Sequence, residues 1–329
     1  VPFIDALCLD FVSEDSAAWM RFLTRQTDAS GIPRDIFETV ITPGKDLIDT
    51  WKKRKIFLQT YSSPIVYWYA FNMEDELLGA SEALRQAMCL CYDVETQIEL
   101  LANGRGRRAV NIIPSSFAGW REAGPGPYYR LDVEEAKKKI AQARRELADK
   151  GLLDSAGEIP EITLDFGSRD ENTQRMADFA RQQFAKIGLR TRAVLNDWPT
   201  LQEKVHNKNV QCYTMGWHAD YPDAENFLQL FYTPNIKKGT NNTNYSNPAF
   251  DRLYEKVRVM SDSPDRTNLY AKMIRMVCED VPVLMLSEPL SFVLYGDWNL
   301  NVKPHPVGYG YLKYRRIDVE MRRRLGGRH

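Results

Sequence analysis

Between residues 162 and 215, the spacing of hydrophobic positions switches repeatedly between the period of a strand and that of a helix. Residues 162–166 form a short β-prone run, and residues 171–186 repeat apolar positions with helical spacing until Gly188. Such an alternation is typical of a parallel sheet, in which ligands bind beyond the carboxyl ends of the strands. The remaining elements of this repeat are a strand at 189–195, a helix at 199–206 and a strand at 210–215.

Elsewhere, apolar spacing and capping residues predict further helices. Asp132 is suited to cap a helix that carries Ala136 and Ile140 on one face, and Asn247 and Ser263, each followed by Pro, are suited to start two more. A short break near residues 92–93 interrupts the helical pattern of the segment before them. The predicted helices are 15–24, 45–55, 79–103, 132–151, 247–260 and 263–279.

Several β-prone runs lie outside the repeat. The most aromatic is 64–72, which contains Tyr67, Trp68, Tyr69 and Phe71 and whose simplest interpretation is a buried strand. Loops are expected at 105–129, which is rich in Gly and Pro, and at 237–246, which is polar. The other expected strands are 6–12, one that begins at Asp28, 56–60, 281–287 and 290–294.

The composition is that of an ordinary globular protein of about two domains, with 329 residues, 43% of them hydrophobic and 27% charged. Lys plus Arg and Asp plus Glu are equal at 44 each, so the overall charge gives no reason to expect a nucleic-acid partner. No run approaches the ~18 apolar residues of a membrane span, and the first residues lack the pattern of a signal peptide. The basic segment 321–329 is expected to be a disordered tail.

Cysteine and histidine positions do not indicate a metal or cofactor site. The five Cys are an odd number without metal-ligand spacing, and their simplest interpretation is that of small buried hydrophobic residues. No Ser-His-Asp order, Gly-rich phosphate loop or His-Glu pair on a helix appears in the sequence. We therefore expect no cofactor, no bound metal and no catalytic residues.

The most informative stretch is 215–223, which reads Met-Gly-Trp-His-Ala-Asp-Tyr-Pro-Asp and follows the last strand of the repeat. Gly216 allows a ligand backbone to come close, Trp217 supplies a flat apolar wall, and Asp220 supplies a carboxylate beside a turn. This combination suits a small, partly apolar molecule with an amine. The alternative is structural, with Trp217 in the core and Asp220 capping the turn before Pro222.

This stretch, with Asn-Phe-Leu at 226–228, resembles the signature of the family 5 extracellular solute-binding proteins, the oligopeptide and dipeptide receptors of ABC importers. Other matches to that family lie at 71–73, 84–87, 92–93 and 244–251, in the family's order and spacing. The resemblance covers about 300 residues, and we interpret the chain as the carboxyl-terminal portion of a longer receptor whose amino-terminal part lies before Val1.

The resemblance implies an α/β fold of the type II periplasmic-binding-protein kind, with two lobes, a hinge, and mixed sheets flanked by helices. Residues 1–71 would form part of the first lobe, residues 72–288 the carboxyl-side α/β lobe, and residues 289–329 the return to the first lobe plus a basic tail. The chain crossings near Asn72 and Glu288 would be the hinge.

The resemblance also assigns a ligand site. Gly216, Trp217 and His218 would offer a main-chain edge to an extended peptide, and Asp220 would pair with the α-ammonium group of the ligand. Tyr69 and Asn72 belong to the strand that leads into the ligand crevice in the family. Thr214 is a departure, because tripeptide-preferring members carry an Arg three residues before the Trp.

By this resemblance, the protein captures short peptides in a cleft between its lobes and delivers them to the membrane permease of an ABC transporter, without acting as an enzyme. It would lie in the periplasm or outside the cell, with an amino-terminal membrane anchor as an option. The alternatives are a non-peptide solute such as an oligosaccharide, nickel or haem, towards which His218 could contribute, and, in a different class, a peptide hydrolase.

Overall fold

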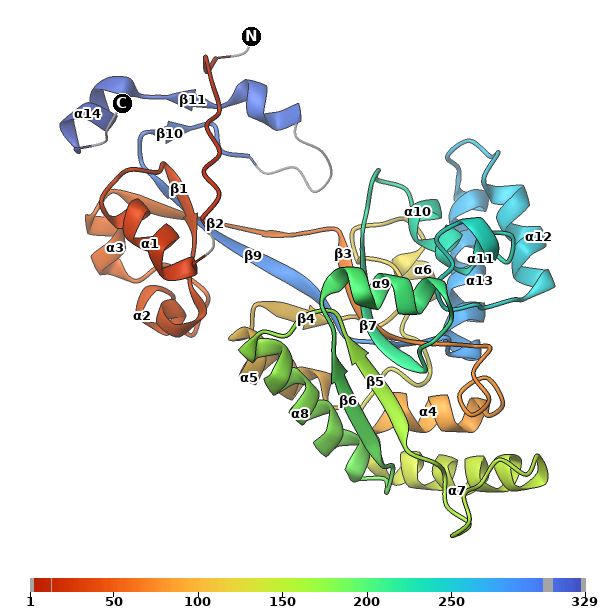
Figure 1. Ribbon diagram of the computed structural model, residues 1–329. Coiled ribbons are helices and arrows are strands. Elements are labelled where there is room, and N and C mark those ends of the chain that lie inside the picture. The colour runs from red at the N-terminus through yellow and green to blue at the C-terminus, as the bar shows by residue number, and fades with distance from the viewer. Residues whose placement is uncertain (1–2, 13, 304–309, 327–329) are drawn as a thin grey trace. The chain divides into compact units, whose positions relative to one another are not determined.

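The computed structural model describes residues 3–12, 14–303 and 310–326 (Figure 1). The chain forms two compact units, of which unit 1 comprises residues 1–63 and 289–329 and unit 2 comprises residues 64–288. The chain therefore passes from one unit to the other after Ser63 and again after Glu288. The expected first crossing was near Asn72. Unit 2 begins earlier because strand β3 (Ile65–Phe71) is an inner strand of its sheet.

Unit 2 is built on a five-stranded mixed sheet with the strand order β6-β5-β7-β3-β8. Three of these strands, β5 (Ile162–Phe166), β6 (Thr191–Leu195) and β7 (Cys212–His218), are parallel, which confirms the repeat predicted from the sequence. The other two come from distant parts of the chain. β3 pairs antiparallel with β7 on one side and with β8 (Val283–Met285) on the other.

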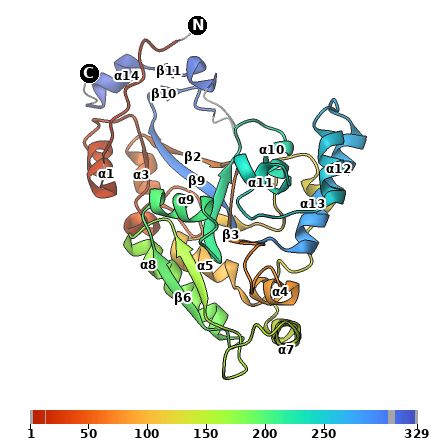
Figure 2. The same ribbon diagram turned by 45° about the vertical axis from the view of Figure 1, so that its right-hand side comes forward.

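Three helices of unit 2 begin at the predicted capping residues. The side chains of Asp132, Asn247 and Ser263 each accept a hydrogen bond from a backbone N–H of the first helical turn. Helix α4 (Glu82–Cys91) packs beside α7 (Val133–Asp149), as Figure 2 shows. The other helices are α5 (Val94–Ala102), α6 (Trp120–Ala123), α8 (Glu171–Ala185), α9 (Trp198–His206), α10 (Glu225–Leu228), α11 (Asn235–Lys238), α12 (Pro248–Val257) and α13 (Pro264–Asp280), and the short elements are β4 (Gly106–Arg108) and η2 (Gln229–Phe231).

Unit 1 is centred on β9 (Ser287–Gly296), which pairs antiparallel with both β1 (Ala29–Gly31) and β2 (Ile56–Ser62). A hydrophobic core that includes Trp19, Phe37 and Phe292 packs beside this sheet. The helices are α1 (Asp15–Leu23), η1 (Arg34–Ile36), α2 (Phe37–Val40) and α3 (Asp49–Lys53), followed near the carboxyl end by β10 (Asn299–Leu300), η3 (Gly310–Tyr314), β11 (Arg316–Ile317) and α14 (Val319–Arg324).

Three sequence predictions for unit 1 are wrong. Residues 6–12 form no strand, because none of the described strands pairs with them, and Phe11 is 99% exposed. The helix expected at 45–55 is reduced to α3, because Ile41 and Leu47 form a bridge that closes a turn just before it. The expected tail starts as the helix α14, which Asp318 caps. The last residues, 327–329, lie outside the described residues.

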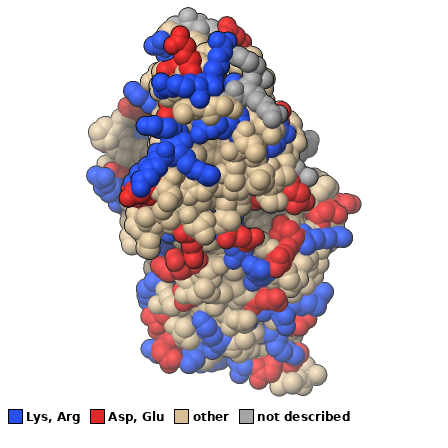
Figure 3. Space-filling view, turned by 90° about the vertical axis from the view of Figure 1, so that its left-hand side faces the viewer, with Lys and Arg blue, Asp and Glu red and all other residues tan. Residues whose placement is uncertain are grey.

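The charge is balanced over the whole chain but unevenly distributed. Residues 289–329 contain eight Lys and Arg but only three Asp and Glu. Lys and Arg side chains gather on the upper part of the face shown in Figure 3. Within residues 289–329, Arg322 is tied to Asp28 at 2.7 Å, so part of this charge stabilises unit 1 itself. Within the described residues, no helix combines the length and the apolar character that a membrane span requires.

Candidate functional site

The signature stretch begins inside strand β7 rather than after it. Gly216, Trp217 and His218 are the last three residues of β7, opposite Tyr67, Val66 and Ile65 of β3. On its other side, β7 pairs with β5 only through Cys212 and Tyr213. Among the described strands, residues 214–218 therefore pair with β3 alone, and their second main-chain edge lies beyond the carboxyl end of β5. An unpaired edge of this kind can accept an extended peptide as an additional strand.

Trp217 and Trp68 lie on the same face of the sheet, because residues two apart on paired strands share a face. Trp217 is partly exposed, whereas Trp68 is 5% exposed. Both residues border a small cavity of about 20 Å³, which has room for about one water molecule. Its lining residues are Trp68, Ala70, Tyr213, Met215, Trp217, Leu230, Phe231, Thr240, Asn242 and Thr243.

Gly216 has a local structural explanation. A Cβ atom at this position would lie 2.4 Å from a ring carbon of Tyr67 and 3.1 Å from the carbonyl oxygen of Val66. Tyr67 is 44% exposed, and its ring occupies the space that a side chain at position 216 would need. Gly216 was expected to leave space for a ligand. On this face of the sheet, the Tyr67 ring occupies that space.

Asn226 connects Trp217 with Asp220. Its side chain is completely buried, and its Oδ1 atom accepts hydrogen bonds from the indole Nε1–H of Trp217 at 2.8 Å and from the backbone N–H of Asp220 at 3.2 Å. Its Nδ2 atom donates to Oδ2 of Asp220 at 3.2 Å. Asp220 itself is exposed. One buried amide thus holds both the aromatic ring and the carboxylate of the signature.

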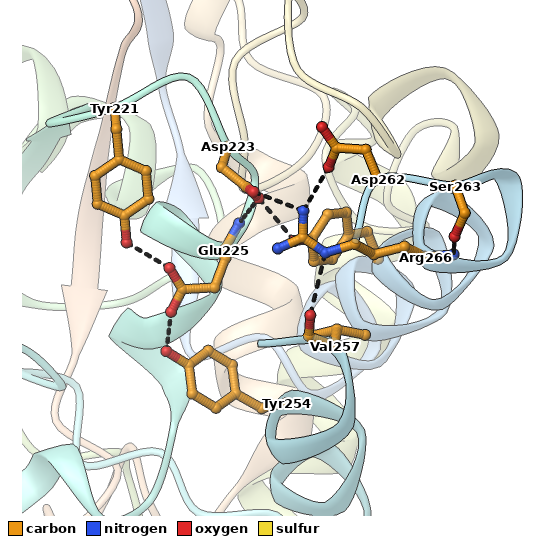
Figure 4. Close-up of polar contacts among 9 residues, drawn as sticks. Tyr221, Asp223, Glu225, Tyr254, Val257, Asp262, Ser263 and Arg266 are labelled. Carbon is orange, nitrogen blue, oxygen red and sulfur yellow. Dashed lines mark hydrogen bonds and ion pairs between the residues drawn. The ribbon is translucent and has the colours of Figure 1, made fainter. Parts of the chain in front are cut away.

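Asp223 anchors the same loop to helix α13. It accepts a hydrogen bond from Arg266 at 2.7 Å (Figure 4). It accepts another from the Tyr270 hydroxyl, also at 2.7 Å. Burial by itself would raise the pKa of Asp223, but hydrogen bonds from the backbone N–H of Glu225 and from Tyr270 and Arg266 hold it below its ordinary value. The carboxylate is therefore ionised at neutral pH, and it fixes the turn that follows Asp220.

Glu225 provides a second anchor, this time to α12. Its carboxylate accepts hydrogen bonds from the hydroxyl groups of Tyr221 and Tyr254, one on each oxygen (Figure 4). Burial, together with the hydrogen bond to Glu225, raises the pKa of Tyr221 to about 12, so the phenol remains a donor at all physiological pH values. Asp223 and Glu225 therefore both fasten this loop to the neighbouring helices.

Residues 1–239 match the model of the protein family described as "Bacterial extracellular solute-binding proteins, family 5 Middle". The chain belongs to this family. The family consists of solute-binding proteins, and the resemblance seen in the sequence is confirmed.

Individual solute-binding proteins are similar in sequence to this chain, at identities of about a quarter. The oligopeptide-binding protein OppA of Bacillus subtilis (strain 168) is 26% identical over 219 residues, which is 66% of this chain and 39% of the relative. Heme-binding protein A of Haemophilus influenzae is 24% identical over 244 residues, which is 74% of this chain and 43% of the relative. The chain thus spans less than half of the length of either curated relative.

The fold is shared with solved family 5 structures. The oligopeptide-binding protein AppA from Bacillus subtilis, solved in complex with a nonapeptide, matches with a TM-score of 0.74 at 20% identity. The match covers 93% of this chain and 59% of that chain. The fold is therefore the mixed α/β fold of the type II periplasmic binding proteins, as the sequence predicted.

Two residues proposed for the site of this family 5 protein are buried in unit 2. Tyr69 is completely buried, packs edge-on against Tyr92 and Phe166, and shares a hydrogen bond of 3.2 Å with the Tyr92 hydroxyl. Tyr69 faces away from Trp68 because neighbouring residues of a strand point to opposite faces of the sheet. Burial raises the pKa of Tyr69. It is a core residue that supports the sheet.

Asn72 is also structural. It is 4% exposed, donates to the carbonyl oxygen of Val210 at 2.9 Å, and accepts from the side chain of Asn244 at 2.8 Å. The first bond ties the end of β3 to the loop before β7, and the second ties it to the loop before α12. The sequence could not separate this role from ligand binding, because an Asn at a strand end suits both.

His218 is exposed at the end of β7. Among the described residues, no group of three or more His, Cys, Asp and Glu side chains is arranged to hold a metal ion. Four of the five cysteines are buried, as expected, but Cys8 is exposed.

The structural roles of Asn226, Asp223 and Arg266 were not predicted from the sequence. The Asn-Phe-Leu segment was visible as part of the family signature, but its contact with Trp217 requires the chain to fold back after the turn. The available signal was an Asn only a few residues after a Trp and an Asp, because an amide that becomes buried in such a loop needs hydrogen-bond partners close by.

Proposed function

We propose that this chain is part of a receptor that captures short peptides as the substrate-binding component of an ABC importer. The observation that carries the proposal is the position of Asp220, an exposed carboxylate directly beyond the part of β7 that pairs on one side only. Membership in family 5 supports a solute-binding role, and the similarity to oligopeptide-binding proteins favours peptides.

In the proposed complex, the peptide lies extended along the free edge of residues 214–218 and exchanges main-chain hydrogen bonds with it. Such bonds do not depend on the side chains of the ligand, so many sequences can bind. Trp217 provides an apolar wall for the ligand, and Asp220 pairs with its α-ammonium group in a charge-assisted hydrogen bond. His218 lies at the rim of this edge.

We propose further that the protein acts outside the cytoplasm, in the periplasm or at the outer surface of the cell, and delivers its ligand to a membrane permease. Anchoring to the membrane through a segment before Val1 is one way to keep it there. No chemical step on the ligand is part of this proposal, since none of the site residues described above forms a pair of nucleophile and base.

The test is native mass spectrometry of the purified 329-residue chain, before and after incubation with a mixture of short peptides. We expect intact peptides to be recovered from the complex. Recovery of peptide fragments would instead indicate a hydrolase. Recovery of a haem or a sugar, with no bound peptide, would replace the peptide by a non-peptide solute, as the similarity to a heme-binding relative allows.

A further inference from the structure

Asn226 is completely buried, and both polar atoms of its side chain form hydrogen bonds within the signature loop. Its Oδ1 accepts from two N–H groups, the indole of Trp217 and the backbone of Asp220. An oxygen that accepts two N–H donors fixes the orientation of the amide, and the Nδ2 group must then point towards Asp220. The side chain of Asn226 therefore has one defined orientation.

This orientation divides the two oxygens of Asp220 between different tasks. Oδ2 accepts the hydrogen bond from Asn226, whereas Oδ1 accepts no hydrogen bond from any residue that the structure describes. The carboxylate is thus held on one side and available on the other. A carboxylate that is already oriented loses less side-chain entropy when it pairs with a cation, so the contact with an ammonium group becomes stronger and more selective.

The same amide also fixes the indole of Trp217. Because Trp217 and Asp220 share one buried support, the apolar wall and the negative charge are held at a constant separation. The support is itself rigid. The neighbouring Phe227 is fully buried and packs edge-on against Phe117, and the backbone N–H of Glu225 donates to Asp223 at 3.0 Å.

We propose that Asn226 is the positioning residue that sets the preference of this site for ligands with a free ammonium group. It acts through Asp220 and Trp217, not by touching the ligand. The proposal deepens the proposed function and rests on it. Its ligand class is peptides with an unmodified amino terminus, as opposed to the same peptides after N-acetylation.

The test compares Asn226→Leu with the wild type, using one peptide in its free and its N-acetylated form. Leu fills a similar volume but can neither accept from Trp217 nor donate to Asp220. We expect the ratio of the two dissociation constants, acetylated over free, to fall roughly tenfold in Asn226→Leu. A role in folding alone would weaken both forms equally and leave this ratio unchanged, which would overturn the proposal.

Asn241→Leu is the matched control. Asn241 is 2% exposed and donates to the carbonyl oxygens of Tyr232 and Tyr245, so its loss removes a comparable buried amide from the same unit without touching the signature. We expect this variant to keep the wild-type ratio. If the ratio fell equally in both variants, the effect would come from general loosening of unit 2, and Asn226 would have no special role.

A double-mutant cycle with Asp220→Asn tests whether Asn226 acts through Asp220. We expect the effect of Asn226→Leu on the ratio to disappear in the Asp220→Asn background, because the charge that Asn226 orients is gone. An undiminished effect there would contradict the proposal. Should Asn226→Leu fail to fold, Asn226→Ser takes its place, because the shorter hydroxyl cannot reach both partners.

The outcomes separate this inference from the proposed function. If the wild type binds peptides but binds both forms equally, the ammonium contact of Asp220 is wrong, and the role of Asn226 falls with it. If the wild type prefers the free form and Asn226→Leu keeps that preference in full, only the inference about Asn226 is wrong. If the wild type binds no peptide in either form, the proposed function itself is wrong.

Discussion

Arg266 donates a hydrogen bond to Asp223 at 2.7 Å while its guanidinium group lies 4.9 Å from the centre of the Tyr270 ring. The same side chain also donates to the carbonyl oxygen of Val257 at 3.1 Å, and it is 8% exposed. A single buried cation thus fastens the signature loop to helix α13 and to the end of α12. The signature loop thus owes part of its shape to residues outside the proposed ligand site.

We predict that Arg266→Met destabilises the protein by about 2–4 kcal/mol, because Asp223 would be left partly buried without its cation. The measurement is the free energy of unfolding in urea. Arg275→Met is the control, since Arg275 lies on the same helix but is exposed, and its loss should cost less than about 0.5 kcal/mol. Equal costs for the two variants would show that the ion pair contributes nothing.

The lowered pKa of Asp223 predicts a dependence of stability on pH. Because the unfolded state takes up a proton at the ordinary value of 3.8 and the folded state only at a lower pH, the contribution of this carboxylate is complete above that value. It is lost as the pH falls through 3.8 towards the folded-state pKa. Asp223→Asn should therefore lose less unfolding free energy than the wild type between about pH 5 and 3. Parallel curves for both proteins would contradict the prediction.

Asp220→Asn should weaken the binding of a peptide with a free amino terminus by about 1–3 kcal/mol, because an amide oxygen carries no charge to pair with the ammonium group. The N-acetylated peptide should lose much less. Isothermal titration calorimetry with both forms of one peptide measures the difference. Losses of equal size would mean that Asp220 is not the partner of the ammonium group.

Gly216→Ala should destabilise the protein by about 1–3 kcal/mol, because the added methyl group collides with the Tyr67 ring. The double variant with Tyr67→Ala relieves this contact. In the Tyr67→Ala background, the cost of Gly216→Ala should fall well below its cost in the wild type, as thermal unfolding can show. If the cost stays the same, the carbonyl group of Val66 or the backbone, and not Tyr67, requires the glycine.

The sequence predicted the parts of the fold that depend on local signals. The strands and helices between residues 162 and 215 were found because period, capping residues and helix-ending Gly188 all agree there. The antiparallel placement of β3 next to β7 could not be predicted, since pairing between distant segments leaves no local signal. Residues 6–12 show the converse error, in which a strand-like pattern has no partner.

The candidate site was predicted in the same uneven way. The signature could be recognised, and Trp217 and Asp220 could be proposed from it, because their chemistry is visible in a single stretch. Tyr69 was assigned by its place in an aromatic strand, but which face of that strand a residue occupies depends on the sheet. Asn226 was overlooked because its importance comes from three hydrogen bonds that exist only after folding.

The one-sided pairing of residues 214–218 would determine where each residue of a bound peptide lies along β7. If the peptide's amino terminus is fixed at Asp220 and its backbone lies along β7, the position of each peptide residue is set by its distance from the amino terminus. The first residues of every peptide then occupy the same places. Longer peptides would differ only in how far they extend. Backbone-cyclised peptides, which have no amino terminus, should be rejected even when their sequence is identical.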